Sequence, residues 1–93
     1  MPQKFYKDLL NQNDFVIVTL EHIDYYMKLL GRRSPFGYAA YAISKLKEPL
    51  SAMRGEIGKL KGIGKTSLRV INEIVESGSS RYYDNLMLEM KIV

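Results

Sequence analysis

The sequence predicts a compact all-α domain of four to five helices. Apolar residues recur at helical spacing along most of the chain, and no run alternates apolar and polar residues long enough to predict a sheet. The chain has 93 residues, of which 46% are hydrophobic. This length and composition are typical of a single globular domain with one modest core.

The first two helices are bounded by recognisable capping residues. A helix is expected over residues 14–30, with Asp14 as its N-cap and Gly31 as its terminator. A second helix begins at Ser34-Pro35, because serine caps well and proline suits the first helical position. The apolar residues assigned to the core in these two helices are Leu20, Ile23, Met27, Leu30, Phe36, Ala39, Ala40, Ile43 and Leu46.

Pro49 ends the second helix, and three further helices are expected after it. A short one leads into a glycine-rich turn, the next spans about 65–77 and ends at Gly78, and Ser79 or Ser80 caps the last. The apolar residues assigned to the core in this half are Ile57, Leu60, Leu68, Ile71, Val75, Tyr83, Leu86, Met87 and Met90.

The turn has the sequence LKGIGK, residues 60–65, with two glycines on either side of one apolar residue. Gly62 and Gly64 are both expected to reverse the chain, because glycine takes positive φ freely, and Ile63 is expected to plug the core. The following helix begins with unpaired backbone N–H groups at its positive end, which binds phosphate. The arrangement is typical of a helix-hairpin-helix, a motif that grips the nucleic-acid backbone.

Basic residues are concentrated around this turn. Residues 28–69 hold ten Lys or Arg and two acidic residues, a net charge of +8, whereas 1–27 and 70–93 each carry −2. A merely solvated face is the alternative explanation. Coincidence with the glycine turn favours polyanion binding. The predicted DNA-contacting residues are Arg32, Arg33, Lys59, Lys61, Gly62, Ile63, Gly64, Lys65, Thr66 and Arg69.

Other functions are disfavoured by what the sequence lacks. The letters GKT at 64–66 resemble the end of a nucleotide-hydrolase phosphate loop, but position 59 is Lys instead of the required glycine. The chain has no cysteine and a single histidine, His22, so neither a disulfide framework nor a thiolate metal site is expected. No apolar signal core begins the chain and its longest apolar run is FVIV, so we expect no membrane partner. We expect an intracellular protein, nuclear in a eukaryote and otherwise cytoplasmic.

Six tyrosines offer a second way to contact nucleic acid, because aromatic rings stack on bases. A place at the edge of the core is the favoured interpretation for such amphipathic side chains. These tyrosines are Tyr25, Tyr26, Tyr38, Tyr41, Tyr82 and Tyr83.

The order of these features resembles the N-terminal domain of family X DNA polymerases, the polymerase beta group. The shared features are an asparagine-led first helix, a basic turn, an aromatic residue before an alanine pair, the GIG hairpin and a helix closed by glycine. They correspond here to Asn11, Gly31-Arg32-Arg33, Phe36 with Ala39-Ala40 and Ile43, Gly62-Ile63-Gly64, and Glu73-Ile74 with Gly78. The resemblance covers roughly residues 11–90. On this resemblance, residues 1–10 are an N-terminal extension and residues 11–93 form the helix-hairpin-helix domain.

A related domain at the N-terminus of crossover-junction endonucleases has the same outline, so both families stay open. Either resemblance implies duplex, gapped or branched DNA as the partner, bound by a monomer, alone or within a larger repair or nuclease complex. It implies a 5′-phosphate at Arg32 and no cofactor except a monovalent cation at the backbone carbonyls of Gly58, Leu60 and Ile63.

The resemblance also bears on catalysis. The lyase of the polymerase family uses a lysine in the second helix of the hairpin to form a Schiff base, and the matching residue here is Val70, which cannot form an imine. Phe36 stands where the family usually has tyrosine. We therefore expect a non-catalytic DNA-binding module, with a protein-interaction domain as the alternative and an abasic-site lyase as the less favoured one. Two questions stay open: whether the nucleic acid is DNA or RNA, and whether the sequence is a complete protein or the front of a longer one.

Overall fold

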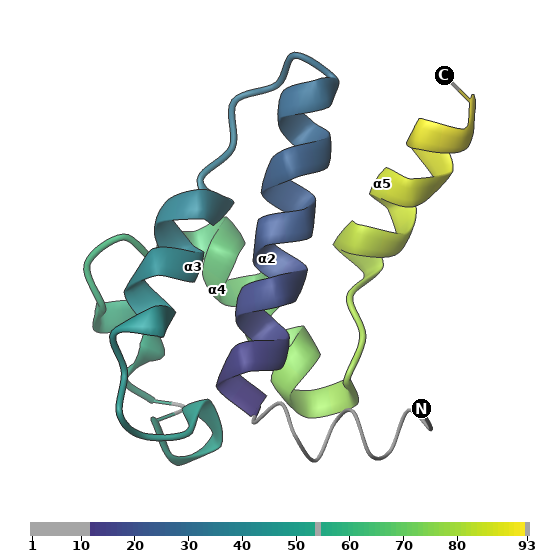
Figure 1. The fold of residues 1–93 in the computed structure, drawn as a ribbon. Coiled ribbons are helices and arrows are strands. Elements are labelled where there is room, and N and C mark those ends of the chain that lie inside the picture. The colour runs from purple at the N-terminus through teal and green to yellow at the C-terminus, as the bar shows by residue number, and fades with distance from the viewer. Residues whose placement is uncertain (1–11, 54, 93) are drawn as a thin grey trace.

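A computed structural model describes residues 12–53 and 55–92 (Figure 1), so the expected extension 1–10 and Asn11 lie outside the described residues. No strand occurs in the described part of the chain, and the predicted all-α fold is confirmed. The elements are the α-helices α2 (Gln12–Leu29), α3 (Phe36–Ser44), α4 (Lys65–Ser77) and α5 (Arg81–Ile92), with the 3₁₀ helices η1 (Leu50–Met53) and η2 (Ile57–Lys59) between α3 and α4.

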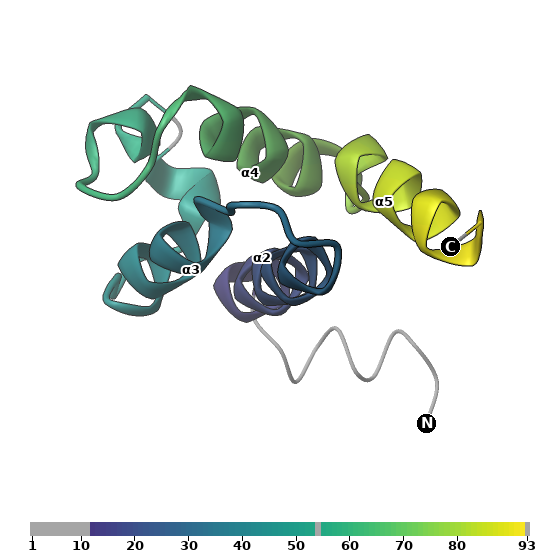
Figure 2. The same cartoon turned by 90° about the horizontal axis from the view of Figure 1, so that it is seen from above.

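The helices form two layers, with α2 and α3 in one and α4 and α5 in the other (Figure 2). Helix α2 packs mainly on α3 and also contacts α4, α5 and η1. One apolar cluster fills the space between the layers, because each helix turns an apolar stripe inward. No helix within residues 12–53 and 55–92 is both long enough and apolar enough to cross a membrane.

The first helix ends as predicted but does not begin as predicted. Gly31 has a φ of +75°, and the Arg32 N–H donates to the Met27 carbonyl at 2.8 Å, which closes the end of α2. Asp14 lies in the first turn of α2, which already includes Gln12, so its assignment as the N-cap is wrong.

Serine hydroxyls accept hydrogen bonds at the starts of two later helices, but the N-cap of α3 is Pro35, so the assignment of Ser34 as that N-cap is wrong by one residue. The Phe36 N–H donates to Ser34 Oγ at 3.1 Å, and the Tyr83 N–H donates to Ser80 Oγ at 3.2 Å. Ser80 is therefore the cap of α5, and of the two predicted candidates Ser79 is not. The short helix predicted before the glycine turn is present only as the 3₁₀ helices η1 and η2.

Helix α4 has the predicted bounds but a different buried face. Its buried residues are Ser67, Val70, Ile71 and Ile74, which follow one another at the i, i+3, i+4 and i+7 spacing of a single stripe. Leu68 is only half-buried, because it covers η2 from outside: a Cβ added to Gly58 would lie 3.0 Å from Leu68 Cδ2. Val75 is likewise half-buried.

A buried amide holds the segment between α3 and η1 against the first layer. Asn13 Nδ2 donates to the Glu48 carbonyl and Asn13 Oδ1 accepts from the Leu50 N–H, both at 2.8 Å. Asn13 is itself buried, so these bonds replace the water it would otherwise need. These two hydrogen bonds therefore hold in place the start of the segment that leads to the glycine turn.

The carboxylate of Asp24 ties α2 to the start of α3. Lys28 Nζ lies 2.9 Å from Asp24 Oδ2, whereas Oδ1 is buried without a hydrogen bond of good geometry. The Ser34 hydroxyl and the Gly37 amide lie beside the carboxylate. Burial by itself would raise the pKa of Asp24, but Lys28, Ser34 and Gly37 outweigh it and lower the pKa below its usual value.

We predict that Asp24→Asn lowers the free energy of unfolding by about 1 kcal/mol at neutral pH, because an N-terminal charge on α3 and its pair are lost. A carboxylate with a lowered folded pKa contributes fully above its unfolded pKa, about 3.9, and loses that contribution as the pH falls through the folded pKa. Urea unfolding of both proteins at neutral pH and near pH 2.5 should show a difference that shrinks in acid. Glu21→Gln, an exposed change on the same helix, is the control, and an equal Asp24→Asn effect at both pH values would contradict the assignment.

Candidate nucleic-acid interface

The glycine turn joins η2 to α4 and is anchored by one side chain. Gly62 has a φ of +97°, and the Ile63 N–H donates to the Leu60 carbonyl at 3.2 Å across the turn. Ile63 is 8% exposed and belongs to the core, as predicted for the plug. The turn is therefore part of the folded core, and α4 leaves it in a defined direction.

The two glycines do different work, and the expectation that both take positive φ is wrong. Gly64 has φ −92° and ψ −174°, an extended conformation that any residue adopts. At Gly62 an added Cβ would lie 3.4 Å from the Tyr38 carbonyl oxygen, whereas at Gly64 it would meet nothing within 4 Å. Gly62 thus permits the left-handed backbone of the turn beside α3, and Gly64 leaves open space at the start of α4.

That open space adjoins the bare N-terminus of α4. Gly64 is the N-cap, no side chain caps the helix, and its first turn holds no acidic residue. The first N–H groups of a helix have no partner within it, and they carry the positive end of the helix dipole. Lys65 and Thr66, the first two helical residues, are exposed beside them. The geometry suits a phosphate held by backbone amides.

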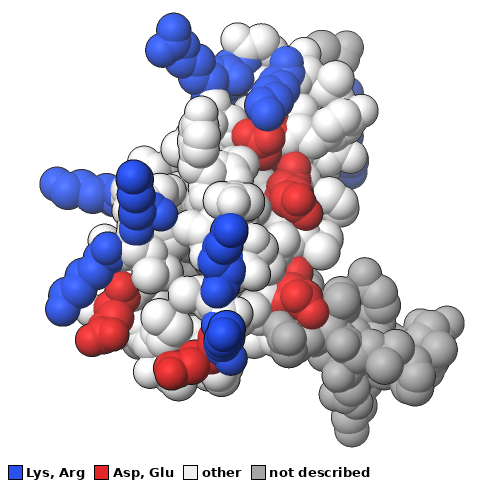
Figure 3. Space-filling model, turned by 60° about the vertical axis from the view of Figure 1, so that its left-hand side comes forward, with Lys and Arg blue, Asp and Glu red and all other residues white. Residues whose placement is uncertain are grey.

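Predicted basic contact residues surround this terminus. All four are exposed and none has an ion pair with another described residue; they are Lys59, Lys61, Lys65 and Arg69. Figure 3 shows basic side chains projecting from one face of the molecule, with acidic ones scattered among them. The basic face is therefore mixed in charge and not one continuous patch.

Arg32 and Arg33, the other predicted basic pair, differ from each other. Both are exposed, but the Arg32 guanidinium donates to Glu89 of α5, and this hydrogen bond raises the pKa of Arg32 further. No described acidic group pairs with Arg33. A phosphate at Arg32 would therefore have to compete with a carboxylate.

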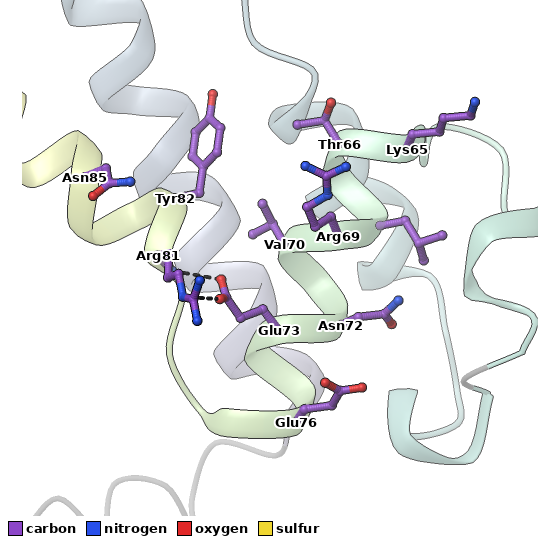
Figure 4. Close-up of a pocket in the computed structure, with 11 residues that line it drawn as sticks. Lys65, Thr66, Arg69, Val70, Asn72, Glu73, Glu76, Arg81, Tyr82 and Asn85 are labelled. Carbon is purple, nitrogen blue, oxygen red and sulfur yellow. Dashed lines mark hydrogen bonds and ion pairs between the residues drawn. The ribbon is translucent and has the colours of Figure 1, made fainter.

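An open groove of about 880 Å³ runs between α4 and α5 (Figure 4). Lys65, Thr66 and Arg69 lie on its α4 side. On the α5 side, the Arg81 N–H donates to Glu73 Oε1 at 2.8 Å. The groove joins a smaller hollow that contains Arg32, because Tyr82 and Asn85 line both. The fold thus places Arg32 along the same path as the start of α4, and Lys59 and Lys61 line neither hollow.

The residues that the family resemblance linked to lyase chemistry lie in apolar surroundings. Val70 points from α4 toward α5 in Figure 4 and is 3% exposed. Phe36 is fully buried with its ring centroid 5.1 Å from that of Tyr82. The Tyr82 hydroxyl donates to Met27 Sδ at 3.6 Å. None of these side chains carries an amine that could form an imine with an abasic sugar.

The backbone carbonyls assigned to a monovalent cation lie along this turn. The Leu60 carbonyl already accepts from Ile63, but no backbone amide of the described residues outside the helices donates to the carbonyl of Gly58 or Ile63. Carbonyl oxygens are the ligands that hard cations prefer, and a monovalent cation at these residues stays a prediction. Within the described ranges, no group of three or more His, Asp or Glu side chains is placed to hold a metal.

A second surface lies beside the turn, which we call the tyrosine groove; sequence analysis considered its tyrosines for base stacking but did not place them next to the turn. It is a hollow of about 550 Å³ between α3 and the turn. Its principal lining residues are Tyr38, Tyr41, Lys45, Leu60, Lys61 and Gly62. The available signal was the spacing of Tyr38 and Tyr41, three residues apart on the helix face opposite Ala39, Ala40 and Ile43.

The chain matches no protein-family model, no curated protein and no solved structure at a significant level. The resemblance to polymerase and endonuclease domains therefore stays a prediction, and function is argued from the geometry above.

The two glycines allow stability and phosphate binding to be separated. Gly62→Ala is expected to lower the free energy of unfolding by about 1–2 kcal/mol, because the positive φ disfavours a Cβ. Gly64→Ser is expected to raise it by a few tenths of a kcal/mol, because serine caps α4, while its hydroxyl takes the amides that a phosphate needs. Urea unfolding and DNA titration of both variants test this. A Gly64→Ser protein that binds DNA as tightly as the wild type would show that the start of α4 is not the phosphate site.

Proposed function

We propose that this chain is a DNA-binding module that grips the phosphate backbone without reading sequence, in DNA repair or recombination. The observation that carries the proposal is the uncapped, acid-free N-terminus of α4 at an exposed glycine. Lys61 and Lys65 stand beside it without ion-pair partners among the described residues. Backbone amides and flexible lysines contact phosphates, which are identical at every base pair, so such contacts position DNA without specifying its sequence.

The groove between α4 and α5 supports a path for the backbone beyond this first phosphate. Its lining includes Lys65, Thr66 and Arg69, together with the carboxylates of Glu73 and Glu76, and it adjoins the hollow at Arg32. We propose that a terminal or internal phosphate near Arg32 displaces Glu89, whose pairing is solvent-exposed and therefore of low strength. A monovalent cation at the Gly58 and Ile63 carbonyls would add a further bridge to the DNA.

One observation favours a different function, a protein-interaction domain in which the hairpin serves as scaffold. Acidic side chains interrupt the basic face in Figure 3, and Glu89 neutralises Arg32. A polyanion gains less from such a face than from a uniformly basic one. Direct titration with DNA separates the two functions.

The module resembles the N-terminal domains of family X polymerases or of crossover-junction endonucleases, and we propose the same working context. It acts as a monomer, alone or within a larger repair or nuclease complex, on duplex, gapped or branched DNA. This context places it inside the cell, in the nucleus of a eukaryote and otherwise in the cytoplasm.

We predict weak, salt-sensitive binding to DNA of any sequence, with a dissociation constant on the order of 10⁻⁴–10⁻⁶ M near physiological salt. In a chemical-shift titration the amides of residues 61–69 should move most, with a second cluster at 31–36. Lys65→Ala should weaken binding equally for all sequences and reduce the salt slope by about one unit. Lys91→Ala removes the same charge from the far end of α5 and is the control. No shift with any DNA at low salt would favour the protein partner.

We propose that the module is not an enzyme, because no residue within 12–53 and 55–92 offers a buried amine that could form an imine with a substrate. Val70 is buried where the resembling family keeps a lysine, and the amines of Lys61 and Lys65 are exposed to solvent, without the apolar surroundings that activate a lysine for imine formation. We predict no borohydride-trapped adduct with 5′-deoxyribose-phosphate DNA above that of an unrelated basic protein. A strong adduct that disappears in Lys65→Ala would overturn the non-catalytic assignment.

A further inference from the structure

The tyrosine groove carries two rings that the fold does not use. Tyr38 is 75% exposed and Tyr41 is 63% exposed, so neither stabilises the core appreciably. By contrast, Tyr26, Tyr82 and Tyr83 are partly buried against the core, as expected for amphipathic side chains. The packing of the domain does not require two large, exposed aromatic rings on one face of α3. Exposed aromatic surface of this kind is typical of a site that binds another molecule.

The charge of the groove restricts that partner. Lys45 Nζ lies 4.8 Å from the centre of the Tyr41 ring, and Lys61 lines the opposite wall, while no acidic residue lines the groove. A partner with a flat apolar face and an adjacent negative charge complements this lining. A nucleobase attached to a phosphate has both features, because every base offers a π-face and every linkage carries a charge.

The groove also adjoins the proposed phosphate site. Gly62 lines the tyrosine groove, and Gly64, two residues further along the same turn, is the N-cap of α4. Lys61 likewise precedes the turn and lines the groove. A strand whose phosphate meets the start of α4 can therefore present its neighbouring base to the tyrosines.

We propose that the tyrosine groove stacks an unpaired nucleobase of the same DNA that the glycine turn holds by its backbone. The base must be unpaired, because in a duplex its faces are covered by neighbouring base pairs. This inference rests on the proposed function and makes it more specific: the preferred ligand contains single-stranded DNA, as at a gap, flap or end. Tyr38 and Tyr41 provide the stacking surfaces, and Lys45 and Lys61 neutralise the adjoining phosphates.

The test uses two single-stranded oligonucleotides of equal length, one of thymidines and one of abasic sugar–phosphate units. Fluorescence anisotropy at two salt concentrations measures the affinity of the whole chain for each. The wild type should prefer the thymidine strand by about tenfold, since loss of one stacked base costs affinity of this order. Tyr38→Ala with Tyr41→Ala should abolish the preference without changing the salt slope, because stacking releases no counterions.

Two controls separate the groove from the turn. Tyr25→Ala removes a comparably exposed tyrosine from α2, outside the groove, and should preserve the preference, as should Tyr38→Phe, which keeps the ring. Equal wild-type affinity for the two strands, with no effect of the tyrosine variants, would overturn the groove as a base site. The proposed function would still stand in that case, and the groove would then suit a protein segment. Failure of the wild type to bind either strand or duplex would overturn the proposed function itself.

Discussion

The candidate site depends on one backbone conformation, the positive φ of Gly62 where the turn packs beside α3. Gly62 has a φ of +97°, which glycine adopts freely and side-chain-bearing residues rarely do, and its backbone lies in van der Waals range of the Tyr38 carbonyl. Ile63 then enters the core immediately after the turn, and together with the buried residues Val70, Ile71 and Ile74 it holds α4 against the rest of the domain. The packing of the turn and of Ile63 therefore sets the direction of α4 and the position of its free backbone amides.

The packing of this one turn beside α3 creates two different surfaces. On one side, the extended backbone at Gly64 leaves the first amides of α4 uncovered. On the other, the turn and α3 enclose the tyrosine groove. Both surfaces forgo stability that ordinary residues would supply, since a capping side chain at residue 64 and a polar residue at 38 would suit an isolated fold better. Such local departures from the rules of folding are typical of binding sites.

Some details of the helices could be predicted from the sequence and others could not. The stop at Gly31 and the serine hydrogen bonds at the starts of α3 and α5 join near neighbours in the chain, so residue type and order suffice to predict them to within a residue. The buried face of α4 was assigned wrongly in part, because Leu68 packs over η2, which comes before it in the chain. Periodicity alone does not say which of two adjacent apolar stripes faces the core.

The sequence by itself determined the all-α class, the glycine turn with its Ile63 plug and the concentration of basic residues near it, because these depend on composition and short-range geometry. Only the tertiary structure decided what those residues meet. It paired Arg32 with Glu89, 57 positions away, buried Val70 between helices and set Tyr38 and Tyr41 beside Gly62. Contacts between distant segments depend on how helices pack in three dimensions, and no local pattern in the chain encodes them.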